Sequence, residues 1–102
     1  MSVRKHNTTK GGYGWTEATK LAVWNKGRVI PDYDPRIWRR DKCGNAMKWS
    51  EHGNRNSEYG WEIDHINPVS NGGGDELSNL QPLHWKNNMD KGDKLNWTCP
   101  RN

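Results

Sequence analysis

The chain has 102 residues, which fits one domain and excludes a second independent core. Only 30% of the residues are hydrophobic, with 13 Leu, Ile and Val, no Phe, and a net charge of +4. That charge is too small to keep the chain unfolded, and seven Trp and three Tyr can replace the missing aliphatic residues, since an aromatic side chain buries roughly 150–250 Å². We therefore expect a small folded domain with a thin core, supported by a metal, a ligand or a partner.

The two cysteines and the polar N-terminus bear on where the protein works. Cys43 and Cys99 could form at most one bridge, far below the cysteine density of a secreted disulfide scaffold, so we favour a reducing compartment. No apolar stretch approaches the roughly 18 residues of a membrane span, and residues 1–10 contain no signal-peptide-like segment. These features predict a cytoplasmic or phage-encoded intracellular protein that has no membrane partner.

Positive charge is concentrated in the N-terminal part of the chain. Residues 1–42 hold ten Lys or Arg and four Asp or Glu, whereas residues 43–102 hold six and eight. Lys and Arg attract phosphate backbones, and the pI of about 9.2 points the same way. The basic half thus suits nucleic acid and the acidic half a cation, although a surface that is simply basic at one end gives the same counts.

The N-terminal third predicts an arm followed by one helix. Residues 1–14 are polar and glycine-rich, which is typical of a flexible arm, here a basic one. Thr16 can cap a helix that stops at Gly27, a residue type favoured just past a helix end. Three apolar residues of this helix have the spacing of a core-packing face: Ala18, Leu21 and Ala22.

Basic and aromatic residues alternate after a proline-bounded turn. Trp38 lies among the basic residues Arg36, Arg39, Arg40 and Lys42. Nucleic-acid grooves use such residues for phosphate contact and stacking, so we expect these four to contact nucleic acid. The alternative interpretation is an anchored Trp38 with solvated basic neighbours.

The second half of the chain predicts two strands, a loop, an edge segment and a helix. Residues 45–51 suggest one strand, and the alternation of side chains over 61–66 suggests a second. Residues 67–78 form a long glycine-rich loop, 79–83 a short apolar segment interrupted by proline, and 84–91 a helix that glycine ends. This order predicts an α+β fold.

Four polar residues in this half could carry chemistry. Asp64 and His65 are adjacent at the end of a predicted strand, Asn79 follows fifteen residues later, and Asn88 lies on the predicted helix. If that helix packs over the strands, the Asn88 amide oxygen can approach the Asp64 carboxylate. A hard divalent cation fits between two such oxygen ligands, with His65 beside it.

Together these residues resemble the HNH endonuclease family, which has the ββα-metal fold. The resemblance rests on Trp61-Glu62-Ile63-Asp64-His65-Ile66, the glycine-rich loop, Asn79-Leu80-Gln81-Pro82-Leu83-His84 and Asn88, and it covers about residues 43–94. It implies a single HNH domain over residues 15–102. A small ββα-metal core at about 59–94 would be joined there by an N-terminal helix and an extra short strand.

The resemblance also implies a role for each polar residue. Asp64 and Asn88 would be metal ligands, His65 the general base, and Asn79 a member of the catalytic set that anchors the loop between the strands. An imidazole with an ordinary pKa near 6.5 is neutral at pH 7 and can take a proton from water. The implied cofactor is one divalent ion, Mg²⁺ or Mn²⁺ or another transition metal, and the implied product has a 5′-phosphate. Lys91 is a further expected nucleic-acid contact, or a charge that favours the helix C-terminus.

His84 has two possible roles. It precedes Asn88 by four residues, so it could be a third ligand on the same helix face, or it could begin the helix and pack or contact DNA. In many members of the family a cysteine of a structural zinc site holds this place. The CxxC pairs of that site are absent here, and the set Cys43, His52, His84 and Cys99 has no short ligand spacing, so we expect no structural zinc.

The leading interpretation is a metal-dependent endonuclease that nicks or cuts double-stranded DNA, with the basic half holding the duplex. The alternatives are a non-catalytic nucleic-acid-binding module on the same scaffold and a small zinc-stabilised interaction domain. A homodimer or a larger phage or bacterial complex is compatible with the sequence, although no heptad or exposed apolar stripe argues for a dimer.

Overall fold

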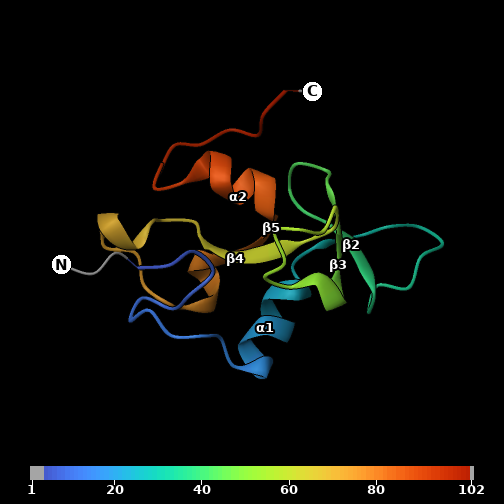
Figure 1. The fold of residues 1–102 in the computed structure, drawn as a ribbon, viewed down its shortest axis with the longest axis horizontal. Helices are drawn as coiled ribbons and strands as arrows, with labels where there is room; N and C mark the ends of the chain where they lie inside the picture. The colour runs from blue at the N-terminus through green and yellow to red at the C-terminus, as the bar shows by residue number, and fades with distance from the viewer. Residues whose placement is uncertain (1–3, 102) are drawn as a thin grey trace.

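A computed structural model describes residues 4–101, in which a ββα unit lies beside a second small sheet (Figure 1). The elements follow the order α1 (Glu17–Trp24), β1 (Arg28–Val29), β2 (Trp38–Arg40), β3 (Ala46–Lys48), β4 (Trp61–His65), β5 (Leu80–His84) and α2 (Trp85–Lys91). Single 3-10 turns occupy Trp49–Glu51, Val69–Asn71 and Leu77–Asn79. No helix in this part of the chain has the length and apolar character needed to cross a membrane.

Strands β4 and β5 form an antiparallel pair that carries the polar residues singled out in the sequence. Asp64 pairs with Gln81 and His65 with Leu80. Helix α2 follows β5 directly and covers one side of the pair, while α1 lies on the other side (Figure 1). The predicted strand over 61–66 and the predicted helix over 84–91 are confirmed to within one residue at each end. The proline of β5 is tolerated because this sheet has only two strands, so both are edges.

The second sheet has the order β1-β2-β3, and all its strands are antiparallel. The expected strand over 45–51 is shorter than predicted, because the chain leaves β3 after Lys48 and continues as the 3-10 turn. This turn sends the Trp49 ring toward the core, where its centroid lies 5.6 Å from that of Trp24.

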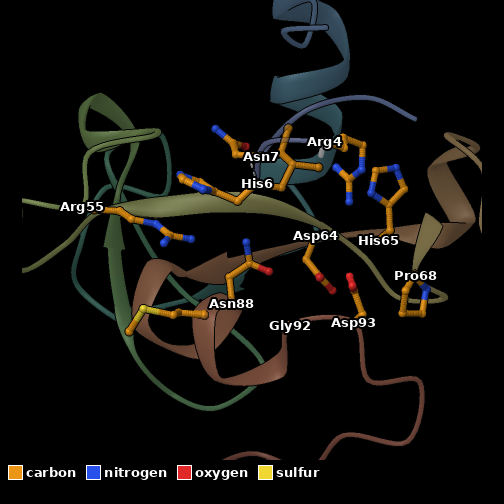
Figure 2. Close-up of a pocket in the computed structure, with 12 residues that line it drawn as sticks. Arg4, His6, Asn7, Arg55, Asp64, His65, Pro68, Asn88, Gly92 and Asp93 are labelled. Atoms are coloured by element: carbon orange, nitrogen blue, oxygen red, sulfur yellow. Dashed lines mark hydrogen bonds between the residues drawn. The ribbon is translucent and has the colours of Figure 1, made fainter. Parts of the chain in front are cut away.

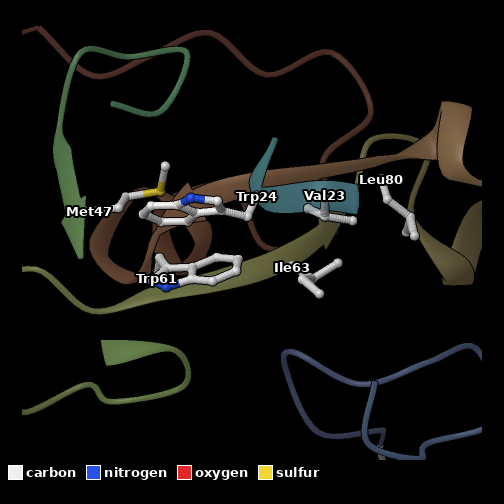
Figure 3. Packing of buried hydrophobic residues seen from close by; sticks show 6 residues of the cluster. All are labelled: Val23, Trp24, Met47, Trp61, Ile63 and Leu80. Atoms are coloured by element: carbon white, nitrogen blue, oxygen red, sulfur yellow. The ribbon is translucent and has the colours of Figure 1, made fainter. Parts of the chain in front are cut away.

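Indole rings fill the centre of the molecule. Trp24 and Trp61 have ring centroids 5.0 Å apart, and Met47, Ile63 and Leu80 complete the packing around them (Figure 3). All five are at most 2% exposed. A core this short of aliphatic side chains is filled because each indole buries a large apolar area, roughly 150–250 Å².

Helix α1 is capped as predicted but packs through a different face. The Thr16 hydroxyl accepts a hydrogen bond from the Thr19 amide. The buried residues are Val23 and Trp24, whereas Leu21 is 50% exposed. The predicted face of Ala18, Leu21 and Ala22 is therefore wrong, because Trp24 takes the core position and rotates the smaller residues outward.

One buried carboxylate joins the loop after β2 to the start of α2. Asp41 is 1% exposed; its Oδ1 accepts hydrogen bonds from the amides of Cys43 and Asn45, and its Oδ2 accepts from the His84 amide and Asn87 Nδ2. The imidazole of His84 is also internal. Its Nδ1 accepts from the Lys86 amide at the first turn of α2, and its Nε2 lies 2.7 Å from the Glu58 carbonyl oxygen. His84 thus begins the helix and packs, the second of its two possible roles.

The two cysteines are joined, which removes the observation on which the expectation of a reducing compartment rested. Cys43 and Cys99 form a disulfide that spans 56 residues. It ties the C-terminal segment to the loop that Asp41 organises. Two lone cysteines far apart in sequence give no indication that the fold brings them together.

We expect the disulfide to stabilise the fold. A cross-link over 56 residues removes about 4 kcal/mol of chain entropy from the unfolded state in the loop-closure treatment. A reductant should lower the melting temperature of the wild type, and the Cys43→Ser, Cys99→Ser double variant should melt at that lower temperature with or without it. A wild-type melting curve that reductant leaves unchanged would contradict the structural role.

The N-terminal segment lies against β4. Asn7 adopts a positive φ of 56°, and its Oδ1 accepts a hydrogen bond from the Ile63 amide at 2.8 Å. The Lys10 amide donates to Asp75 in the glycine-rich loop. Residues 4–10 of the predicted flexible arm are therefore held in place by long-range contacts, which local composition does not reveal. Residues 1–3 of that arm lie outside the described part of the chain.

His52, which contacts this segment, should stay neutral well below neutral pH. Burial, the largest cause, and the charge of Lys20 together lower its pKa to about 4, against the opposing charges of Glu62 and Glu17. The neutral ring can donate its Nε2–H to Asn7 Oδ1, 3.1 Å away. Since the folded pKa lies below the unfolded value near 6.5, the unfolded chain binds more protons between these values, and stability should fall as the pH drops from 6.5 toward 4.

The NMR resonances of the His52 ring should accordingly titrate near pH 4, with His52→Gln used to assign them. A midpoint near 6.5 in the folded protein would show that the His52 ring is solvated and does not form the buried contact with Asn7.

Candidate active site

A pocket of about 270 Å³ lies between the end of β4, helix α2 and the N-terminal segment (Figure 2). Asp64 and His65 enter it from β4, Asn88 from α2, and Arg4 and His6 from the N-terminal segment. Three of the four residues expected to form the site thus line one cavity. Asn79, the fourth, is not among the residues that line it.

Asp64 is a buried carboxylate with two internal partners. It is 5% exposed, its Oδ2 accepts a hydrogen bond from Gln81 Nε2 at 2.9 Å, and its Oδ1 lies 3.2 Å from Lys91 Nζ. Burial raises the pKa of Asp64 above its ordinary value, although Gln81 and Lys91 act in the opposite direction. The carboxylate is thus incompletely compensated, and further positive charge in the pocket would stabilise its ionised form.

Lys91 is part of this buried pair and does not lie on the surface. It is 2% exposed, and its Nζ also donates a hydrogen bond to the backbone oxygen of His65 at 2.9 Å. The expectation that Lys91 contacts nucleic acid therefore lacks the exposure it needs. A lysine near a helix C-terminus is usually solvated, and only the fold reveals that this one points inward.

The imidazole of His65 is held by a carboxylate that the sequence analysis missed. His65 Nε2 lies 2.8 Å from Asp75 Oδ1, and the Trp15 ring packs beside the imidazole with centroids 5.6 Å apart. Burial raises the pKa of Asp75, but hydrogen bonds from His65 and from the Lys10 amide outweigh it and leave a lowered value. An ionised Asp75 accepts a hydrogen bond from Nε2–H of His65. In the neutral ring Nδ1 then carries no proton.

The position of Asp75 offered one signal. It follows three consecutive glycines and precedes Asn79 by four residues, in a loop that has to return to the strand pair. The three glycines themselves predict only that the backbone of this loop needs conformational freedom.

Asn79 fastens the same loop. Its Nδ2 donates to the backbone oxygens of Asn67 and Gly74, and its Oδ1 accepts from the Asn67 amide. At Gly73 a Cβ would lie only 1.7 Å from the Asn67 backbone oxygen, so the close approach of the two loop ends requires glycine. These contacts suit an anchor rather than a group that touches substrate.

Asn88 is oriented by a second buried carboxylate, Glu62. Asn88 Nδ2 donates to Glu62 Oε1 at 2.8 Å, and Arg55 donates to both oxygens of Glu62. Because a carboxylate accepts hydrogen bonds only, the Asn88 NH₂ group must face Glu62. Its amide oxygen is then left on the side of Asp64, as Figure 2 shows.

Glu62 itself is fully buried, and its pKa is lowered. Burial alone would raise the pKa, but hydrogen bonds from Arg55 and Asn88 and the charges of His6 and Arg55 outweigh it. His6 Nε2 lies 3.3 Å from Glu62 Oε2, so the N-terminal segment also contacts this carboxylate. No motif in the sequence predicts these roles of Glu62, Arg55 and His6.

The four basic residues expected to contact nucleic acid fall into two groups. Arg36 pairs with Asp34 at 2.9 Å, and Arg39 donates to the backbone oxygens of Pro35, Asn25 and Gly27. Arg40 and Lys42 instead line a second pocket, which β5 also borders through Leu80, Gln81 and Pro82.

The donors in the first pocket suit a hard cation. Asp64 and Asn88 offer oxygen ligands, the kind Mg²⁺ and Mn²⁺ prefer, and such ions usually keep several waters besides one or two protein ligands. Over residues 4–101 there is no cluster of three or more His, Cys, Asp and Glu side chains placed to hold a metal.

The fold and the pocket together define a class of protein, one in which a carboxylate and an imidazole at the end of a strand face an amide on the following helix. A family model described as HNH endonuclease matches residues 41–94, more than half of the chain. The chain therefore belongs to the HNH endonuclease family, which confirms the resemblance found in the sequence. No curated protein and no solved structure matches it.

The buried contacts of Glu62 lead to a stability prediction. Glu62→Gln places an amide NH₂ against donors of Arg55 or Asn88 and leaves a partly buried guanidinium unpaired, so the free energy of unfolding should fall by about 2–4 kcal/mol. The matched control Glu58→Gln changes an exposed side chain and should stay within about 0.5 kcal/mol of the wild type. Equal denaturation midpoints for the two variants would contradict the role given to Glu62.

Proposed function

We propose that the protein is a divalent-metal-dependent DNA endonuclease that hydrolyses phosphodiester bonds at the pocket between β4 and α2. Members of its family are typically phosphodiester hydrolases that use a divalent metal and act on nucleic acid. The observation that carries the proposal is the meeting of Asp64, His65 and Asn88 at one cavity, with the His65 ring held by Asp75.

Asp64 and Asn88 would hold the cation through a carboxylate oxygen and an amide oxygen. Glu62 keeps the Asn88 oxygen turned toward Asp64, and Gln81 fixes one oxygen of the carboxylate. When bound, a divalent cation polarises the scissile phosphate and stabilises the departing 3′ oxygen.

His65 would act as the general base. With Nε2–H directed at Asp75, the lone pair on Nδ1 is the free one, and it takes a proton from the attacking water. The water oxygen forms a bond to phosphorus while the bond from phosphorus to the 3′ oxygen breaks, and solvent protonates that oxygen. The products carry a 5′-phosphate and a 3′-hydroxyl. Asp75 also stabilises the imidazolium that forms, and Asn79 keeps the intervening loop in place.

The alternative is a module that binds nucleic acid on the same scaffold without turnover. The contacts of Asp75 and Glu62 favour the enzyme, because they orient a ring nitrogen and an amide oxygen that binding alone would leave free to rotate. Whether DNA is nicked on one strand or cut on both follows from the products of the assay below.

Purified protein should nick supercoiled plasmid in the presence of Mg²⁺ or Mn²⁺, and EDTA should stop the reaction. His65→Ala should lower turnover by roughly 10²- to 10⁴-fold while affinity for DNA changes little, as expected for loss of a general base. Cleavage that persists in EDTA would remove the metal from the mechanism, and loss of DNA binding in His65→Ala would make His65 a contact residue instead.

Titration with Mn²⁺ by calorimetry tests the ligands without requiring activity. Asn88→Ala should weaken Mn²⁺ binding at least tenfold, whereas the matched control Asn96→Ala, at an exposed position after α2, should bind like the wild type. Equal Mn²⁺ affinities for the two variants would refute the assignment of Asn88.

A further inference from the structure

A second pocket of about 270 Å³ lies between β5 and strands β1 and β2 of the other sheet. Four positively charged side chains line it. Lys26 and Arg28 come from the end of α1 and from β1, and Arg40 and Lys42 from β2 and the loop after it. Of these four, only Arg40 and Lys42 were expected to contact nucleic acid. The pairing of β1 with β2 places Arg28 opposite Arg40, and Lys26 lies between α1 and β1. We call these four residues the basic pocket.

The charges of the basic pocket are not neutralised internally. None of the four makes an ion pair within 4.0 Å to a carboxylate of the described residues, whereas Arg36, Arg55 and Lys91 each do. Their hydrogen bonds go to backbone oxygens instead. Lys26 donates to Leu77 and Leu80, Arg28 to Asp41, and Arg40 to Gly44. A backbone carbonyl orients a cation and leaves its net charge available to a ligand.

One acidic residue, Asp41, also lines this pocket and offsets one of the four positive charges. It is 1% exposed, and its carboxylate oxygens accept hydrogen bonds from the amides that join the β2 loop to α2. Four positive side chains and one buried carboxylate leave the cavity with a net positive charge, which suits an anion with several negative oxygens.

The basic pocket is adjacent to the candidate active site. Gln81 lines the basic pocket and donates its Nε2–H to Asp64 Oδ2, and Ile66 lines it directly after His65. The end of the β4-β5 pair is thus the wall between the two pockets. A polyanion bound at Asp64 and His65 that continues across the end of this sheet meets the basic pocket.

We propose that the basic pocket binds phosphates of the DNA backbone that flank the scissile bond. The duplex is then gripped on both sides of the β4-β5 pair, with one phosphate at the candidate active site and its neighbours at Arg28, Arg40 and Lys42. The inference rests on the proposed function for the identity of the polyanion. Of the four residues of the basic run that were expected to contact nucleic acid, this proposal keeps Arg40 and Lys42. It adds Lys26 and Arg28.

The test is binding of a fluorescent 20-base-pair DNA duplex in EDTA, followed by anisotropy over a series of salt concentrations. The Arg28→Gln, Arg40→Gln, Lys42→Gln variant should bind at least tenfold more weakly near 0.1 M salt. The slope of log affinity against log salt should become shallower by about 2 to 3, since each lost phosphate contact contributes about 0.9. The matched control Arg36→Gln should keep the wild-type slope. Lys26 is left unchanged because its amino group ties the end of α1 to β5.

Wild-type binding in the triple variant, or an equal loss in Arg36→Gln, would overturn the proposal. Tighter binding of an RNA duplex of the same sequence would also overturn it. Thermal melting checks that the triple variant is folded. If it is not, Lys42→Gln decides, because within residues 4–101 the Lys42 ammonium makes no hydrogen bond or ion pair and lies 5.7 Å from the centre of the Trp97 ring. The salt slope of this single variant should change by about 1. A further outcome is that the variants show DNA binding to depend on the basic pocket while the wild-type protein cleaves no plasmid with Mg²⁺ or Mn²⁺. That result would support the inference and refute the proposed endonuclease activity.

Discussion

The structure depends on the burial of two carboxylates on one short strand. Glu62 and Asp64 are two residues apart on β4, so both side chains leave the same face of the strand, where α2 covers them. Each buried charge needs its own partners, and the fold supplies Arg55, Asn88 and His6 to one and Lys91 and Gln81 to the other. The partners of these two acids come from α2, β5, the loop before β4 and the N-terminal segment, so satisfying them fixes where those segments lie.

A carboxylate also organises the place where many members of the family hold a structural zinc. In this chain residue 84 is His, and Asp41 receives hydrogen bonds from the His84 amide and from the Asn87 side chain. The disulfide between Cys43 and Cys99 ties the same loop to the C-terminal segment. Hydrogen bonds to one acid and a single covalent link thus join the segments around the thin tryptophan core.

Features that depend on residues close together in the sequence were predictable, and features that depend on contacts across the fold were not. The strand at 61–66, the helix at 84–91 and the Thr16 cap were predicted because periodicity and capping are properties of neighbouring residues. The gathering of Asp64, His65 and Asn88 followed from that order of elements together with the family resemblance. The partners of these residues were missed, since Asp75, Glu62 and the N-terminal Asn7 act across the fold. The inward turn of Lys91 and the pairing of the cysteines are likewise decided by tertiary packing.

The residues that line the first pocket fall into two sets, those between Cys43 and Cys99 in the chain and those before Cys43. The covalent ring closed by Cys43 and Cys99 encloses Asp64, His65 and Asn88, so a protease that cleaves one peptide bond inside it leaves both fragments attached. Arg4 and His6 lie outside the ring, and the exposed Gly12 follows them in the chain. After cleavage at that glycine, only noncovalent contacts, such as those of Asn7 with Ile63 and of His6 with Glu62, would hold their wall of the cavity.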